Sequence, residues 1–220
     1  SMNSPIAHDI ASVIGPCRKL MRKAAECGDV VLVTRLLQDG IRDAESLRSA
    51  SRHGHPEVVR LLLQDGITDD EALCVASRNG HELVVQLLLE AGIRHDHALY
   101  EAVDAGHIYV VEMLLEAGIR HDDALYQACE DGRVEIVEML LEAEVESNDA
   151  LYAAASNGYV EIVKMLLEAG IEDEEALHAA ADEGHVEIVE MLLKAGMRTI
   201  DTRSIRHLDP RIESLVRQYR

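Results

Sequence analysis

Apolar residues recur along the chain at a helical spacing, in pairs of short stretches. Leu99, Ala102 and Val103 stand at positions i, i+3 and i+4, and the next stretch repeats this spacing at Ile108, Val111, Leu114 and Leu115. This period places the apolar side chains on one face of a helix, whereas a strand would need strict alternation. The pattern therefore predicts short amphipathic helices that come in pairs, and no segment requires a strand.

Glycines divide this pattern into equal repeats. One series falls in the middle of each helix pair, at Gly28, Gly54, Gly80, Gly106, Gly132, Gly158 and Gly184. A second series follows each pair, with Glu144 in place of one glycine, at Gly40, Gly66, Gly92, Gly118, Gly170 and Gly196. Both series have a period of 26 residues. Glycine is the usual residue at the left-handed position that ends a helix, so each repeat is predicted to be a first helix, a tight turn, a second helix and a short linker.

Seven repeats of this length follow one another without an insertion. A single repeat cannot bury its own apolar face, so the repeats must stack. The expected fold class is an all-α solenoid of seven stacked helix-turn-helix repeats with helical caps. The chain has no Trp and no Phe, and small residues would let neighbouring first helices approach closely. These residues are Ala24, Ala50, Ala76, Ala102, Ala128, Ala154 and Ala180.

Helix starts and chain ends carry their own signals. Ser4 and Pro5 are typical of a helix start, Gly15 and Pro16 are predicted to end that helix, and a last helix is expected from 209–210 onward. The predicted organisation is an N-terminal capping helix at 1–16, seven repeats at 17–197 and a C-terminal capping helix at 198–220. The two caps would carry apolar stripes at Ile6, Ile10, Val13 and Ile14 and at Ile212, Leu215, Val216 and Tyr219. The predicted N-caps of first helices are Asp70, Asp96, Asp122, Asn148 and their neighbours.

The charge of the chain excludes several classes of function. It contains 21 basic and 41 acidic residues, for a net charge of −20. A general nucleic-acid binder needs a basic surface for phosphate contacts, and so does a protein that binds anionic membranes. The four cysteines form no C-x-x-C pair, and the N-terminus has no basic-then-apolar signal pattern. We therefore expect an intracellular, cytoplasmic protein that binds neither nucleic acid nor membrane.

The last repeat resembles the ankyrin repeat. Its first helix, 176–181, reads A-L-H-A-A-A, and 184–196 reads G-H-V-E-I-V-E-M-L-L-K-A-G. These stretches are similar to the family's L-H-x-A-A core and its G-H-x-x-[IV]-V-x-x-L-L-x-x-G second helix. An ankyrin repeat is about 33 residues long and begins with a β-turn, whereas the linker at 170–175 is short and no Thr-Pro occurs. The resemblance therefore implies a stack of helix pairs without the family's protruding hairpins.

Candidate catalytic and metal-binding groups have simpler explanations. Histidines and aspartates occur in successive linkers, at His95, Asp96, His97, His121, Asp122 and Asp123. Neighbouring linkers lie too far apart to meet at one ion, since ligand distances are about 2.0–2.2 Å. Four further histidines follow the turn glycine and are expected either to face solvent or to bond to turns, namely His55, His81, His107 and His185. No catalytic triad or phosphate-binding loop is evident, so we expect no enzymatic activity, no cofactor and no metal.

The variable positions of the first helices are the candidate binding site. The position six residues before the turn glycine and the position two residues before it lie four apart, on one flank of the helix. We call this flank the first-helix strip. Its predicted partner-binding residues are Arg48, Arg52, Arg78, Tyr100, Asp104, Tyr126, Glu130 and Tyr152. An alternative reading is structural, in which the three tyrosines replace the ankyrin histidine and bond to the next turn.

These observations favour a monomeric protein-interaction module without enzymatic activity. Tyr and Arg are typical contact residues, and residues 67–197 hold 6 basic and 30 acidic residues. We therefore expect the partner to be a protein or peptide with basic and apolar residues, bound along the first-helix strip. The arginines would meet an acidic or carboxylate end of the same segment. The alternative is a purely structural or engineered solenoid without a specific partner.

Overall fold

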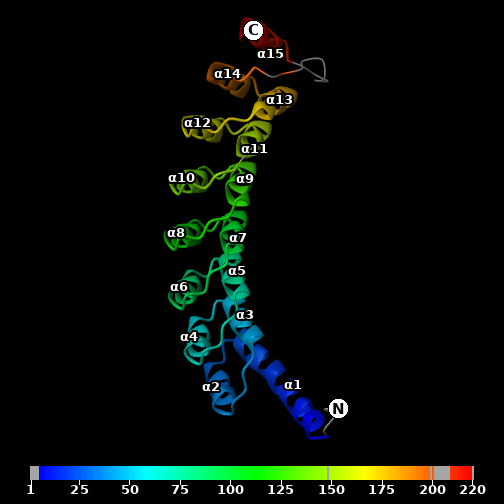
Figure 1. Cartoon of the computed structure of the whole chain (residues 1–220), viewed down its shortest axis with the longest axis vertical. Helices are drawn as coiled ribbons and strands as arrows, with labels where there is room; N and C mark the ends of the chain where they lie inside the picture. The colour runs from blue at the N-terminus through cyan, green and yellow to red at the C-terminus, as the bar shows by residue number, and fades with distance from the viewer. Residues whose placement is uncertain (1–4, 148, 199, 201–208, 220) are drawn as a thin grey trace. The chain divides into compact units, whose positions relative to one another are not determined.

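Fifteen α-helices form the regular structure of the residues that the computed structural model describes, which are 5–147, 149–198, 200 and 209–219 (Figure 1). No strand occurs among them. The helices are α1 (Pro5–Glu26), α2 (Val30–Gln38), α3 (Ala44–Arg52), α4 (Pro56–Gln64), α5 (Glu71–Arg78), α6 (Glu82–Glu90), α7 (His97–Ala105), α8 (Ile108–Glu116), α9 (Asp123–Glu130), α10 (Val134–Glu142), α11 (Ala150–Asn157), α12 (Val160–Glu168), α13 (Glu174–Asp182), α14 (Val186–Ala195) and α15 (Pro210–Tyr219). The all-helical fold class is confirmed.

The chain consists of two compact units, an N-terminal unit at Ser1–Ile119 and a C-terminal unit at Arg120–Arg220. In the N-terminal unit the first helices α1, α3, α5 and α7 pack in one row, and the second helices α2, α4, α6 and α8 form another row (Figure 1). The C-terminal unit repeats this arrangement, with α9, α11 and α13 in one row and α10, α12 and α14 in the other. Helix α15 packs against α14.

Small side chains explain why first helices pack more closely with one another than second helices do. Ala50, Ala76 and Ala102 are fully buried between them. Larger aliphatic side chains such as Leu62 and Leu88 fill the space between the two rows and are also fully buried. Buried alanine and aliphatic side chains therefore replace the aromatic core that the composition lacks.

Second helices end in the same hydrogen-bonded motif. After α4, the N–H of Gly66 donates to the carbonyl of Leu63 at 3.0 Å, and the N–H of Ile67 donates to the carbonyl of Leu62 at 3.0 Å. Gly66 has φ +78°, and the following Ile67 is buried. This is the Schellman arrangement of a left-handed residue followed by an apolar contact. At the break in the glycine series, Glu144 takes the same left-handed conformation, with φ +56°.

Histidines join consecutive repeats, as the turn-bonding interpretation predicted. Nε2 of His81, at the start of α6, lies 2.9 Å from the backbone carbonyl of Arg52 in the preceding repeat. The same bond joins His55 to Glu26 and His107 to Arg78 in the N-terminal unit, and His185 to Ser156 in the C-terminal unit. Because a carbonyl only accepts hydrogen bonds, the proton in each ring lies on Nε2, and the bond fixes the register between repeats.

The prediction that Gly15 and Pro16 end the first helix is wrong. Helix α1 continues through both residues as one helix of 22 residues, so no separate capping helix ends at 16. Proline disfavours the helical conformation of the preceding residue partly by a clash with its Cβ. Gly15 has no Cβ and its φ is not positive, so this part of the cost is absent. The predicted stripe at Ile6, Ile10, Val13 and Ile14, and the Ser4 cap, lie outside the residues whose side chains are described.

The predicted N-caps are confirmed at one neighbouring residue, but not at Asp70, Asp96 and Asp122 themselves. Asp70, Asp96 and Asp122 already have helical backbone angles, and their side chains make no capping bond. The capping function falls one residue earlier at α5, where Oδ1 of Asp69 accepts from the N–H of Glu71 at 3.0 Å. Asn148 is not among the described residues.

The last helix begins where the sequence predicted. Oδ1 of Asp209 accepts from the N–H of Arg211 at 2.8 Å, at the start of α15. Ile212 and Val216 are buried on the side of this helix that packs against α14. The guanidinium carbon of Arg198 lies 5.7 Å from the ring centre of Tyr219, within the range of a cation–π contact.

Candidate functional site

The eight residues of the first-helix strip are divided between the two units. Arg48 and Arg52 lie on α3, Arg78 on α5, and Tyr100 and Asp104 on α7, all in the N-terminal unit. Tyr126 and Glu130 lie on α9 and Tyr152 on α11, in the C-terminal unit. Each unit therefore presents its own part of the strip.

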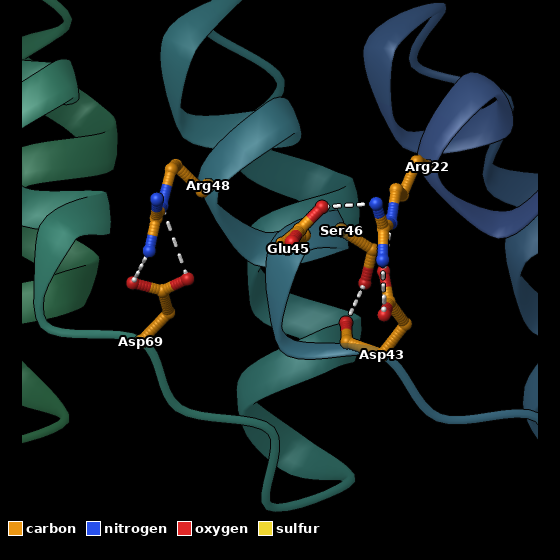
Figure 2. Close-up of polar contacts among 6 residues, drawn as sticks. All are labelled: Arg22, Asp43, Glu45, Ser46, Arg48 and Asp69. Atoms are coloured by element: carbon orange, nitrogen blue, oxygen red, sulfur yellow. Dashed lines mark hydrogen bonds and ion pairs between the residues drawn. The ribbon is translucent and has the colours of Figure 1, made fainter. Parts of the chain in front are cut away.

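Arg48 is held by a carboxylate of the next linker (Figure 2). Its Nε lies 3.2 Å from Oδ2 of Asp69 and its Nη2 lies 3.0 Å from Oδ1. The Asp69 side chain is 6% exposed, against 38% for Arg48. Hydrogen bonding to Asp69 raises the pKa of the Arg48 guanidinium above its ordinary value. Arg48 thus uses its planar fork to tie one repeat to the next, which is the bidentate geometry that favours arginine over lysine.

One repeat earlier, the same geometry recurs at Arg22. Its Nε and Nη2 donate to the two carboxylate oxygens of Asp43 at 2.7 and 3.1 Å. Arg22 also forms an ion pair with Glu45, and the hydroxyl of Ser46 donates to the backbone carbonyl of Asp43 (Figure 2). At the strip position six residues before the turn glycine, Arg22 and Arg48 therefore both join one repeat to the next.

Arg78 is also engaged within the chain, and its partner was not identified from the sequence. Its Nε donates to Oε2 of Glu101, a residue on α7 that is 7% exposed. Nε2 of His97 lies 3.3 Å from the other carboxylate oxygen of Glu101. The 26-residue period contained a signal, because Glu101 is the one acidic residue at a position that holds Lys23, Ser49, Val75, Gln127, Ala153 and Ala179 in the other repeats. Glu101 is therefore a buried carboxylate held by two basic side chains.

Cys74 interrupts the strip between Arg48 and Tyr100. Its side chain is buried, and burial together with the carboxylates of Glu71 and Glu101 raises the pKa of its thiol to about 12. A thiol with this pKa stays protonated near neutral pH and is a poor nucleophile and metal ligand. The part of the chain that the structure describes contains no group of three or more His, Cys, Asp and Glu residues placed to hold a metal ion.

The remaining strip residues of the N-terminal unit are more accessible. Arg52 and Asp104 are exposed on α3 and α7. The half-buried ring of Tyr100 stacks on His97, with ring centres 5.2 Å apart and planes 13° from parallel. His97 therefore supports Tyr100 on one side and faces Glu101 on the other.

In the C-terminal unit, two tyrosines lie near each other on adjacent first helices. Tyr126 on α9 is half-buried, and Tyr152 on α11 is 40% exposed. Burial raises the pKa of the Tyr126 phenol, and so does Glu130, which both repels its charged form and bonds to its hydroxyl. Tyr152 and Asp149 raise the same pKa by electrostatic repulsion, and the helices α9 and α11 pack against each other. This surface combines aromatic area with carboxylates, which suits an apolar and cationic side chain.

Comparison with known proteins identifies the class of repeat. The family model of ankyrin repeats (3 copies) matches residues 47–124, 73–149, 99–175 and 125–204. These stretches together span more than half of the sequence, and the chain belongs to the ankyrin repeat family. Ankyrin repeats are generally protein–protein interaction modules and typically have no enzymatic activity.

A solved structure shows the same fold. The crystal structure of the human ASB11 ankyrin repeat domain is similar to this chain with a TM-score of 0.59 and 23% sequence identity, and the match covers 79% of this chain and 97% of that one. At this identity the likeness concerns the fold. The departure from the family is visible in the linkers, since residues 39–43 alone join α2 to α3, with no hairpin. No curated protein sequence matches the chain.

Membrane insertion has no support among the described residues, where every helix is too short or too polar to cross a bilayer.

Proposed function

We propose that the chain is a protein-interaction module that holds a partner segment on its first-helix strip, with Tyr126, Glu130 and Tyr152 as the central contact. The observation that carries this proposal is the exposure of Tyr152, at 40%, beside Tyr126 on the adjacent helix. A tyrosine of this exposure on a packed helix offers rigid contact area at low entropic cost, which is why tyrosine is frequent at binding hot spots.

The charge around the two tyrosines favours a partner segment with lysine or arginine. Glu130 and Asp149 lie next to Tyr126, and both carboxylates are exposed. Opposite charge speeds the encounter of two proteins, and salt weakens this effect. The partner would therefore bring an apolar side chain onto the tyrosines and a basic side chain to the carboxylates.

In this proposal, Arg48 and Arg78 of the N-terminal unit do not meet an acidic end of the partner, although the sequence predicted that they would. Arg48 and Arg78 are bound to Asp69 and Glu101, so they hold the surface in place. Arg52 is exposed and is the arginine available to meet an acidic group. In this proposal Arg52 and Asp104 are the contact residues of the N-terminal unit.

The proposal is tested by capturing partners on the full chain, crosslinking them and mapping the crosslinks by mass spectrometry. Crosslinks should fall on α9 and α11, and affinity for the captured partner should fall at least about tenfold in the double variant Tyr152→Ala, Glu130→Lys. The matched control is Glu135→Lys, which makes the same charge change on the exposed face of second helix α10. Crosslinks on the second helices, or a larger effect of the control variant, would overturn the proposal. A failure to capture any partner would favour the purely structural solenoid.

A further inference from the structure

The second helices of the N-terminal unit expose large apolar side chains at one repeat position. Val31 on α2 is 80% exposed, Leu83 on α6 is 65% exposed and Tyr109 on α8 is 69% exposed. Each is the second residue of its helix. They are the most exposed large apolar side chains of the described chain, and their regular position sets them apart from apolar residues scattered singly over a surface.

Folding does not require these apolar residues. The same position holds glutamate in all four remaining repeats, at Glu57, Glu135, Glu161 and Glu187. The glutamate at this position is exposed in each of these four repeats. Leu83 and Tyr109 are thus departures from a polar position, and the stability of the array does not explain them.

Leu83 and Tyr109 border hollows between the second helices. A hollow of about 400 Å³ lies between α4 and α6, and its lining includes Leu83, Leu87 and Pro56. A second, of about 310 Å³, lies at the start of the same two helices and shares Pro56 and Leu83 with the first. A third, of about 220 Å³, lies at the start of α6 and α8 and is lined by Tyr109. Three neighbouring hollows therefore follow one another along α4, α6 and α8.

Acidic residues outnumber basic ones on this face, where Arg60 of α4 lines the first hollow together with Glu57 and Glu90. Helices α6 and α8 contain no Lys or Arg, and their charged residues are four exposed glutamates, Glu82, Glu90, Glu112 and Glu116. An acidic rim around an apolar centre disfavours an acidic partner and attracts a basic one.

We propose that the second-helix face of the N-terminal unit, formed by α4, α6 and α8, is a docking surface for a protein segment that carries apolar side chains flanked by lysine or arginine. The apolar side chains fill the hollows beside Leu83 and Tyr109, and the flanking cations meet the glutamates. This surface lies on the row of helices opposite to the first-helix strip, so it does not depend on the function proposed for that strip.

The test uses the full chain and a synthetic probe. The probe is a fluorescein-labelled amphipathic peptide with leucines on one face and lysines on the other, and one leucine is replaced by a photo-crosslinking analogue. We expect saturable binding at low salt, crosslinks within 82–90 and 108–116, and a loss of affinity of about tenfold in the Leu83→Glu, Tyr109→Glu variant. A second peptide with glutamate in place of lysine should bind at least about tenfold more weakly.

The control is Leu20→Glu, which removes an exposed leucine of similar size from α1, where Leu20 is 46% exposed. It should leave peptide affinity unchanged. Thermal melts should show that the Leu83→Glu, Tyr109→Glu variant is folded, because other repeats already hold glutamate at this position.

Three outcomes would overturn the proposal. One is equal affinity of the parent and the Leu83→Glu, Tyr109→Glu variant, and another is a set of crosslinks on the first helices or throughout the acidic C-terminal unit. The third is self-association of the parent, measured by sedimentation equilibrium, that the variant abolishes, because the occupant would then be a second copy of this chain. The Tyr152→Ala, Glu130→Lys experiment reports on the other face, so failure of one proposal is distinguishable from failure of the other.

Discussion

The imidazole ring of His81 lies against the Cα of Gly54, so closely that a Cβ on this glycine would be 2.7 Å from Nδ1 of the ring. Gly54 also has φ +69°. The glycine is therefore required twice, once for its backbone conformation and once for the space that the histidine of the next repeat occupies. Gly66 has φ +78°, but a Cβ there would have no atom within 4 Å, so Gly66 meets only the first requirement.

We predict that Gly54→Ala destabilises the protein more than Gly66→Ala does. The left-handed conformation costs an alanine roughly 1–2 kcal/mol in either variant. In Gly54→Ala the ring of His81 must also move, which weakens its 2.9 Å bond to the carbonyl of Arg52, for a further loss of about 1 kcal/mol. Chemical denaturation of the two variants measures the difference. Equal losses would mean that the ring moves away at no cost.

In the C-terminal unit, Gly132→Val should lower the melting temperature strongly. A Cβ at Gly132 would lie 2.6 Å from Cζ of Tyr159, and Gly132 has φ +71°. A β-branched residue is poorly tolerated in this region of backbone conformation. A melting temperature equal to that of the parent in differential scanning calorimetry would contradict both the turn and the ring contact.

Glu144→Gly should stabilise the protein, by something under about 1 kcal/mol. Glu144 is exposed and has φ +56°, in the position that glycine holds in the other repeats. Glycine takes this conformation without the clash of a Cβ. The comparison is Glu138→Gly, at an exposed position inside α10, which should destabilise by about 1 kcal/mol. A loss of stability in Glu144→Gly, measured by urea denaturation, would indicate a specific contact of the glutamate.

The buried carboxylate of Glu101 predicts strongly non-additive mutations. Arg78→Ala removes one of the two basic side chains at Glu101 and should destabilise the fold by about 1–2 kcal/mol, because solvent screens an ion pair whose arginine is 61% exposed. Adding Glu101→Ala should restore most of this loss, since alanine stands at the equivalent positions 153 and 179. Additive losses in a double-mutant cycle would show that Glu101 is not held through Arg78.

The buried thiol of Cys129 predicts a loss of stability at alkaline pH. Burial raises the pKa of this thiol from 9.0 to about 12. Above pH 9 the thiol ionises in the unfolded chain but stays protonated in the folded chain. The contribution of the buried thiol to the free energy of unfolding is therefore complete below pH 9 and is lost as the pH rises toward 12. Between pH 8 and about pH 10.5, the free energy of unfolding of Cys129→Ala should therefore fall by about 1–2 kcal/mol less than that of the parent. Identical pH profiles in urea denaturation would contradict this.

The sequence predicted the helices well because their causes are local. Apolar spacing within one helix and a glycine at its end suffice to place α7, α8 and the turn at Gly106. The sequence did not predict that α1 continues through Gly15 and Pro16. A proline usually ends a helix, but here the residue before it is a glycine, which has no Cβ to clash with the proline ring.

The candidate site was harder to predict because its contacts join different repeats. Arg48 was assigned to a partner's carboxylate, yet Asp69 of its own chain, 21 residues later, holds it. Asp69 could not be distinguished by sequence from Asp70, which makes no capping bond. The exposure of Leu83 was not predicted, because helical periodicity does not encode how far neighbouring second helices stand apart.

The histidine bonds between repeats span only 29 residues of chain. In the C-terminal unit, excision of residues 159–184 would join His185 to Gly158, in the place that Tyr159 holds now. The imidazole would then meet Gly132 as the tyrosine ring does, and every remaining repeat would keep a neighbour of the same kind. Contacts this local also favour rapid folding. The gene for this protein can therefore gain or lose whole repeats by duplication or deletion and still encode a chain that folds, so its length is open to evolution in steps of 26 residues.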